Sequence, residues 1–374
     1  MLALFSTKVF PIENNAAILT PLSFYFILYY FYLFIFCSSI FSSYPSDEIE
    51  AIIQRHHPYN HTSMKKYTHA WLAFMAMKRL ELADIPQEHL ANAQWLVKWF
   101  KDYRDFVISG SWYPDDVFKD MATSHIIKYR PDEKSNHVSF RKMPNTLRCY
   151  QLGLKSPLYQ KPFTIEAGNL ADRCEAFAQS IVDSFKMLRT EDKGNPISPS
   201  NNHIATRFFI LSHYIADCHM PLHCDARSFS MGANIHAFIE SEWDKQMRAS
   251  YELDKDNKRF FYDPQGYPLK KKMTDLMTAV EQEIVERPFK YEWGSGCKNT
   301  WDYMSGVSQY SYLMAYRMIP AEYDNTNLNK DTFRELDCWK EFDNYSKDIF
   351  SDTVESIARV WLHVWARYRQ WAKM

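Results

Sequence analysis

The sequence predicts an all-α fold made of several packed helices. Glycine accounts for only 9 of the 374 residues, whereas aromatic residues make up 16% of them. Long stretches also place apolar residues at helical spacing, and we find no convincing run of alternating strand residues. Few glycines and many aromatic side chains suit long packed helices better than a turn-rich β protein. A small hairpin in residues 126–165 or 251–269 is compatible with this class.

The N-terminal segment differs from the rest of the chain. Residues 16–41 contain no charged side chain, and this run exceeds the about 20 residues that span a bilayer. It is also longer than the core of most signal peptides, about 7–15 residues, although CSSIFSS at its end offers small residues for cleavage. We interpret residues 1–43 as a membrane anchor or a signal. We therefore expect a membrane-associated or secreted protein whose main domain lies outside the cytoplasm.

A polar linker over residues 44–66 leads into the main domain, residues 67–374. The first two helices are expected over 69–82 and 88–108, where apolar residues recur every three or four positions. Asp84-Ile85-Pro86 separates these two helices, because proline cannot continue a helix. A loop over residues 109–120 follows, indicated by Gly110 and Pro114.

The second half of the main domain continues the helical pattern. Residues 126–165 are irregular and basic, and 191–202 read as a loop rich in turn residues. Between and after them, apolar periodicity predicts helices over 167–188, 203–217, 271–287, 298–318 and 346–372.

Charge and cysteine content exclude some classes of protein. The net charge of −1 gives no electrostatic case for binding duplex nucleic acid. The seven cysteines contain no CxxC pair, so the sequence predicts neither a disulfide framework nor a zinc ribbon.

Metal-binding side chains are concentrated in LSHYIADCHMPLHCDARS, residues 211–228. His213 and Asp217 are four residues apart, which puts them on one face of a helix. Pro221 then ends regular helix, so His223 can approach from another direction. A single His–Asp pair of this kind is more often a surface contact than part of a metal site.

A second pair strengthens the case for metal. His236 and Glu240 are also four residues apart, and both pairs lie in apolar helical sequence, where an unpaired charge would be expensive. Imidazole and carboxylate groups are ordinary ligands of zinc. The residues themselves thus predict a metal site.

The segment HYIADCHMPLH has the form H-Y-x-x-D-x-x-x-P-x-H, which resembles the signature of zinc-dependent phospholipase C. The fungal single-strand-specific zinc nucleases share a related pattern. HAFIE matches the H-x-x-x-E that follows in the phospholipases. Upstream, GSWYPD supplies Gly110 and Asp115, ATSHI supplies His125, and YTHAWLAF supplies His69. The resemblance extends from about His69 to VESIARVWLHVWARY near the C-terminus.

This resemblance implies a multi-helix bundle of the zinc-dependent phospholipase C and nuclease type, with two or three Zn²⁺ ions. The implied activity is hydrolysis of a phosphodiester, a lipid in the phospholipases, by a metal-activated water. Asp115 or Asp217 would be the catalytic carboxylate that takes the proton of that water. The implied ligands are Asp115, His125, His213 and Asp217 for the first ion, His223, His236 and Glu240 for the second, and His69 with a shared Asp217 for the third.

The chain departs from the family pattern in two places. The family completes its third metal with an N-terminal Trp, but the first tryptophan here is Trp71. Three alternatives would account for this. Processing makes a new N-terminus, the third ion is absent, or one of the linker histidines replaces the tryptophan; those histidines are His56, His57 and His61. Choline-binding members also place an aromatic residue where this chain has Asp116, so the head group is left open.

Two other functions remain compatible with these residues. One is a single-strand nuclease or nucleotidase with the same metal centre, and the other is a non-catalytic helical protein that metals stabilise. Among the neighbouring residues, we expect Cys218 and Cys224 to be buried thiols and His219 to lie outside the ligand set. Asp225 and Arg227 are expected to line the approach of a phosphate.

Overall fold

The structure is a computed structural model that describes residues 66–374 except 83, 120–122, 191–197, 228, 230–232 and 294–296. These residues belong to one structural unit, 61–374. The uncharged run at 16–41 and the linker up to residue 65, with its three histidines, lie outside the described residues.

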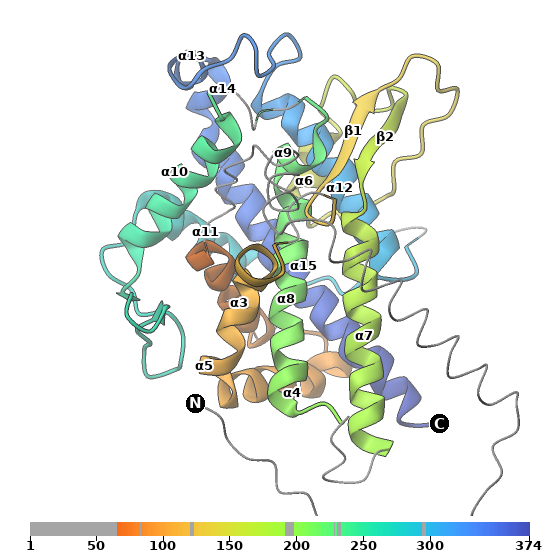
Figure 1. The fold of residues 1–374 in the computed structure, drawn as a ribbon, viewed down its shortest axis with the longest axis vertical. Helices are drawn as coiled ribbons and strands as arrows, with labels where there is room; N and C mark the ends of the chain where they lie inside the picture. Colours follow the sequence, from red (N-terminus) through yellow and green to blue (C-terminus); the bar gives the residue numbers. More distant parts are fainter. Residues whose placement is uncertain are drawn as a thin grey trace, which may run out of the picture. The chain divides into compact units, whose positions relative to one another are not determined.

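The described residues are mostly helical, which confirms the predicted all-α class (Figure 1). The helices predicted from periodicity are present with shifts at their ends, except that the predicted helix 88–108 is divided at Tyr103 into α4 and α5. The segment 109–120, expected to be a loop, instead contains two short helical turns, η1 and η2, and Pro114 stands at the first position of η2, where its missing N–H costs nothing. The helical elements are α3 (Lys66–Leu80), α4 (Gln87–Asp102), α5 (Arg104–Val107), η1 (Ile108–Trp112), η2 (Pro114–Phe118), α6 (Arg148–Gly153), α7 (Leu170–Thr190), α8 (Asn201–His219), α9 (Pro221–Cys224), α10 (Ile235–Ser250), α11 (Asp275–Glu286), α12 (Thr300–Met318), α13 (Lys330–Glu335), α14 (Asp337–Lys340) and α15 (Phe342–Trp371).

Two small antiparallel strand pairs lie close to the two places where the sequence left a hairpin open. β1 (Ile127–Pro131) pairs antiparallel with β2 (Phe163–Gly168), although α6 lies between them in the chain, and β3 (Leu253–Asp254) forms a hairpin with β4 (Arg259–Phe260). An isolated bridge between Tyr129 and Asp225 joins β1 to the end of α9. The pair of β1 and β2 is thereby fixed beside the metal-binding segment.

Helix α8 is the central element of the fold (Figure 1), and it contacts α3, α7, α12 and α15. Its residues are buried almost without interruption from Phe208 to His219, which is typical of a helix surrounded by others. Gly110 of η1 lies against this helix, and a Cβ at that position would come within 2.5 Å of the carbonyl oxygen of Thr206. Only glycine permits this approach, and it brings the η1–η2 segment onto α8.

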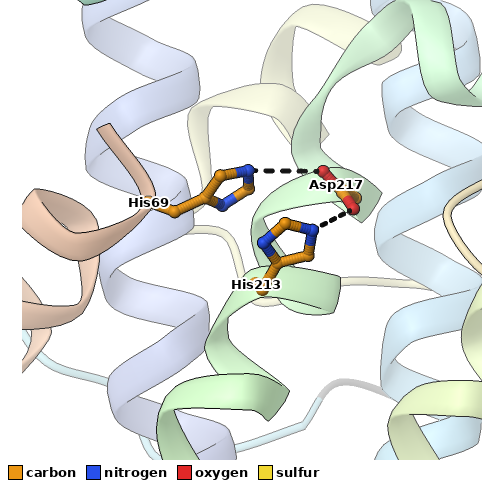
Figure 2. A group of neighbouring side chains, drawn as sticks. All are labelled: His69, His213 and Asp217. Atoms are coloured by element: carbon orange, nitrogen blue, oxygen red, sulfur yellow. Dashed lines mark ion pairs between the residues drawn. The ribbon is translucent and has the colours of Figure 1, made fainter. Parts of the chain in front are cut away.

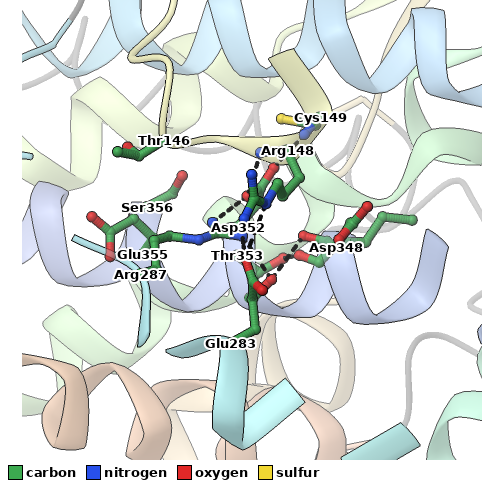
Figure 3. A network of polar contacts seen from close by, with 12 residues as sticks. Thr146, Arg148, Cys149, Glu283, Arg287, Asp348, Asp352, Thr353, Glu355 and Ser356 are labelled. Atoms are coloured by element: carbon green, nitrogen blue, oxygen red, sulfur yellow. Dashed lines mark hydrogen bonds and ion pairs between the residues drawn. The ribbon is translucent and has the colours of Figure 1, made fainter. Parts of the chain in front are cut away.

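A second part of the core is held by buried ion pairs between α15 and its neighbours (Figure 3). Asp352 pairs with Arg287 and accepts hydrogen bonds from the backbone amides of Arg148 (2.9 Å) and Cys149 (2.6 Å). One turn further along α15, Glu355 pairs with Arg79 of α3 at 2.8 Å. These contacts join α15 to α3, α6 and the end of α11. No helix within the described ranges is long and apolar enough to cross a membrane.

Candidate metal centre

All eight predicted ligands are described, and the structure brings them together in the interior. They come from α3, η2, the loop before β1, α8, α9 and α10. Seven are buried, and Asp115 is partly buried. Their possible ligand atoms form three groups in which every pair lies within 4.8 Å: His69 with His213 and Asp217; Asp115 with His125 and His213; and His223 with His236 and Glu240.

Local sequence explains how several of these side chains are presented. The buried α8 carries His213 and Asp217 on one face and ends at His219, just before Pro221. Pro221 opens α9, which turns His223 back toward α8. Asn234 caps α10 by accepting a hydrogen bond from the amide of Ala237 at 3.0 Å, and this cap fixes the first turn of α10.

We call Asp115, His125 and His213, together with Asp217, the first group, and His223, His236 and Glu240 the second group. The first group has separations close to those of a tetrahedral metal site. The Nε2 atoms of His125 and His213 are 3.1 Å apart. Asp217 Oδ2 lies 3.3 Å from Nε2 of His213 and 3.8 Å from that of His125. Asp115 Oδ1 lies 3.5 and 3.7 Å from the same two atoms. Ligand atoms about 2.0–2.2 Å from one tetrahedral ion are about 3.3–3.6 Å apart, so the separations that involve the two imidazoles are close to the edges of one such site.

The second group is also compact. His223 and His236 bring their Nε2 atoms to 3.0 Å. Glu240 Oε1 lies 2.9 Å from Nε2 of His236 and 3.7 Å from Nε2 of His223. Three protein ligands leave one position of a four-coordinate ion for water or substrate, as in catalytic zinc sites.

Asp217 lies between the groups, and Figure 2 shows His69 and His213 both directed at its carboxylate. Its Oδ2 atom faces the first group, while Oδ1 is 3.8 Å from His69 Nε2 and 3.6 Å from His223 Nδ1. The rings of His69 and His213 stack at 3.9 Å with 20° between their planes. A carboxylate with its two oxygens facing different imidazoles can bridge two cations.

Unsatisfied polar atoms at this centre also point to a cation. Among the described residues, neither ring nitrogen of His69 nor Oδ2 of Asp217 has a hydrogen-bond partner. A buried polar atom without a partner is destabilising, and a buried carboxylate more so. Imidazole nitrogen and carboxylate oxygen are both good ligands of divalent metals. The donor set, its spacing and its unsatisfied atoms therefore fit bound metal ions.

Electrostatics couple metal binding to proton release. Burial opposes protonation of His213, but the neighbouring Asp115 and Asp217 outweigh it and raise its pKa well above the usual value. Burial lowers the pKa of His69, and it lowers that of His236 to about 3. In the protein without ions, His213 thus holds a proton between two carboxylates. A metal ion must displace that proton, because only neutral imidazole is a ligand.

Ser111 orients one of the ligands, which the sequence did not predict. His213 Nδ1 donates a hydrogen bond to the backbone carbonyl of Ser111 at 2.8 Å. This bond leaves Nε2 directed at the first group, as the outer partners of metal-bound histidines do. The position of Ser111 depends on the contact of Gly110 with α8, so no local sequence signal indicates its role.

Lys128 is a second residue that the sequence analysis missed. It lies on β1, three residues after His125, and Nζ donates a hydrogen bond to the carbonyl of Leu222, next to His223. Its charge also contributes to lowering the pKa of His236. Lys128 therefore holds α9 against β1, beside the second group.

The neighbours of the ligands have structural roles. His219 is buried, and its Nε2 lies 2.8 Å from the hydroxyl of Ser356, outside the three groups. Cys218 and Cys224 are buried thiols, as predicted.

Arg227 fixes the end of α12. The Arg227 guanidinium donates to Asp225 and to the backbone carbonyls of Ile319 and Pro320 at the end of α12. That Asp225 and Arg227 line the approach of a phosphate stays a prediction.

The fold and the geometry define the class of site: a buried centre of His, Asp and Glu side chains that can hold more than one metal ion. No family model and no curated protein sequence matches the chain. The functional argument therefore depends on the residues and their arrangement.

Proposed function

We propose that the protein is a metal-dependent hydrolase of phosphodiester bonds, similar to the zinc-dependent phospholipases C. The observation that carries this proposal is the pair of ligand groups on either side of Asp217, one of which has only three protein ligands. Zinc is the first candidate, because its ligands in proteins are of these types. A purely structural site would more often supply a complete set of four protein ligands.

Metal ions held by these groups would supply Lewis acidity, lowering the pKa of a water molecule and neutralising charge on phosphoryl oxygens. The first ion would be held by Asp115, His125, His213 and Asp217, and the second by His223, His236 and Glu240. A third would use His69 and the shared Asp217. The residue that would complete the third set, for which His56, His57 and His61 are candidates, lies outside the described residues.

Asp115 is the better candidate for the carboxylate that accepts a proton from water. Both oxygens of Asp217 already face imidazoles, and its side chain is only 3% exposed, against 8% for Asp115. Asp115 also lies on η2, at the more open side of the first group. A base must reach both its proton donor and the solvent that finally takes the proton. In this proposal, Asp217 mainly holds the two groups together.

A lipid phosphodiester is the proposed substrate class. The uncharged run at 16–41 would tether the chain to a membrane or direct its export, so that the catalytic domain acts outside the cytoplasm. The balanced net charge argues against duplex nucleic acid as a substrate.

The direct test is turnover by the purified full-length protein after loading with Zn²⁺. Phosphatidylcholine, single-stranded DNA and a phosphomonoester would be compared with and without a chelator. We expect chelator-sensitive hydrolysis of the phospholipid. Preferential cleavage of the DNA would favour the nuclease alternative, and bound metal without turnover of any substrate would favour the non-catalytic one.

A matched pair of variants on α10 tests the second group. Glu240→Gln removes a ligand charge with little change in volume, and we expect hydrolysis to fall about 100-fold or more, since even outer partners of metal ligands contribute 10–100-fold. Glu242→Gln is the control, because Glu242 lies outside the three groups. Equal activity in both variants would show that the second group is not part of the catalytic centre.

A further inference from the structure

A cavity of about 710 Å³ lies between η2, α7 and the first half of α8. This volume is within the range of about 300–1,000 Å³ that is usual for small-molecule sites. Much of its wall is aromatic or aliphatic, formed by Phe106, Tyr113, Phe118, Phe177 and Ile210. The cavity is separate from the three ligand groups, since none of their members lines it.

Two arginines, Arg173 and Arg207, line the cavity. Its described lining residues include no aspartate or glutamate. Nη1 of Arg207 donates to the hydroxyls of Ser180 (2.5 Å) and Ser184 (2.9 Å), which are neutral groups. Within the described ranges no carboxylate forms an ion pair with Arg207, and partial burial lowers its pKa. A partly desolvated guanidinium of this kind favours an anionic ligand, because phosphate and carboxylate match its donor geometry.

Exposed apolar side chains continue the cavity outward. Phe106 is 63% exposed and Phe118 is 42% exposed, and Val117 beside it is exposed as well. Aromatic groups in contact with water carry a hydrophobic cost that a bound apolar group removes. The cavity and its rim together offer a long apolar surface with a cation beside it, which is complementary to an amphiphilic anion.

The cavity adjoins the residues that support the first ligand group. Tyr113 and Phe118 flank Asp115 in the chain, and Ile210 is one turn before His213 on α8. On the other side, Arg173 lies over the ring of Tyr214 at 5.3 Å, and Tyr214 in turn stacks on His125 at 5.3 Å. A ligand here would touch residues that contact the metal centre while leaving the centre itself free.

We propose that this cavity binds a single-chain lipid anion, with its alkyl chain against the aromatic walls and its phosphate or carboxylate head on Arg207. The proposal goes beyond phosphodiester hydrolysis and does not depend on it, because binding here requires no turnover. A lipid anion held beside the metal centre would keep the protein on an anionic lipid surface.

Calorimetric titration of the full-length, metal-loaded protein with decyl phosphate, below its micelle concentration, tests the site. We expect saturable binding that is at least about tenfold weaker for propyl phosphate, because most of the apolar contact is lost. Decanoate should bind if the head-group site accepts any anion, whereas selective binding of decyl phosphate would assign it to phosphate. Decyltrimethylammonium, which has the same chain and the opposite charge, should not bind.

Two variants locate the ligand within the molecule. Arg207→Met keeps the length of the side chain and removes the charge, and it should weaken decyl phosphate at least about tenfold. Arg130→Met, at an exposed arginine of β1 outside the cavity, is the control. Phe106→Ser, at the exposed rim, should weaken binding of decyl phosphate more than that of propyl phosphate. Because the side chain of Phe106 is already exposed, the substitution should leave the fold intact. Affinity that is unchanged in both cavity variants but lost in Asp217→Asn would place the phosphate on the metal centre and overturn the proposal.

Discussion

Asp217→Asn is the substitution that tests the bridging arrangement most directly. The amide keeps the size of the side chain but removes its charge, and one of its two terminal atoms becomes an N–H donor that cannot bind a cation. Oδ2 of Asp217 faces His213 and His125, and Oδ1 faces His69 and His223. We therefore expect the variant to lose more than one equivalent of metal, whereas loss of a ligand to a single ion would remove one.

The size of the effect on stability follows from this count. An ion present at 100 times its dissociation constant stabilises the folded state by about 2.7 kcal/mol, so two lost ions correspond to about 5 kcal/mol. For a domain of this size, an unfolding entropy of about 2.1 cal/mol/K per residue means that each kcal/mol moves the melting temperature by about 1.5 °C. The variant should then melt about 8 °C below the wild type in the presence of zinc. After chelation the two proteins should melt much closer together.

The assay pairs metal analysis of the purified proteins with thermal melts before and after chelation. Asp244→Asn is the control: Asp244 is also buried, but it bonds Thr68 and Arg248 rather than the ligand groups. This control should lower the melting temperature in both conditions and keep the increment due to zinc. Full metal content and a full zinc increment in Asp217→Asn would refute the bridging role.

Three further predictions concern the rest of the chain. Arg287→Met leaves Asp352 as a buried charge without its partner (Figure 3) and should cost about 3–5 kcal/mol in chemical denaturation, whereas Lys98→Met, in an exposed pair, should cost less than about 1 kcal/mol. Burial would raise the pKa of Asp352, but Arg287 and the other partners of this carboxylate lower it. The contribution of Asp352 to stability is therefore complete above the unfolded pKa of about 3.9 and is lost as pH falls through the folded pKa. Asp352→Asn should flatten the acid limb of a stability–pH curve. Deletion of residues 1–43 should release a folded domain that retains the metal of the first two groups, because their ligands begin at Asp115, and this is checked by circular dichroism and metal analysis.

The helices and the ligand set were the most predictable features of the sequence. Apolar periodicity predicted α7, α8, α12 and α15, because each of these helices buries a continuous face whose apolar residues recur at helical spacing. The candidate ligands could be recognised because they form two pairs, each on one helix face at fixed spacing: His213 with Asp217, and His236 with Glu240. Their convergence with His69 and His125 depended on the family resemblance, since no local rule brings distant segments together.

Features that depend on tertiary approach could not be predicted. The 109–120 segment was expected to be a loop because Gly110 and Pro114 are typical of turns, yet close packing of Gly110 on α8 holds helical turns there. Ser111 accepts the hydrogen bond of His213 through its backbone carbonyl, so the identity of its side chain does not indicate this role. The backbone partners of Arg227 could not be predicted either, because these carbonyls at the end of α12 lie far along the chain.

The position of the candidate metal centre bears on whether its ions act in catalysis or in folding. The ligand groups connect α3, η2, α8, α9 and α10, so loss of metal would leave a buried, uncompensated carboxylate at the point where these segments meet. The end of α11 and α15 are joined by ion pairs that involve none of the ligand groups, among them Arg287 with Asp352. We therefore expect the first group, with four candidate ligands around the bridging Asp217, to contribute most to stability. The second group has three candidate ligands, so an ion held there would keep one position open, which is the property required of an ion that exchanges water and substrate.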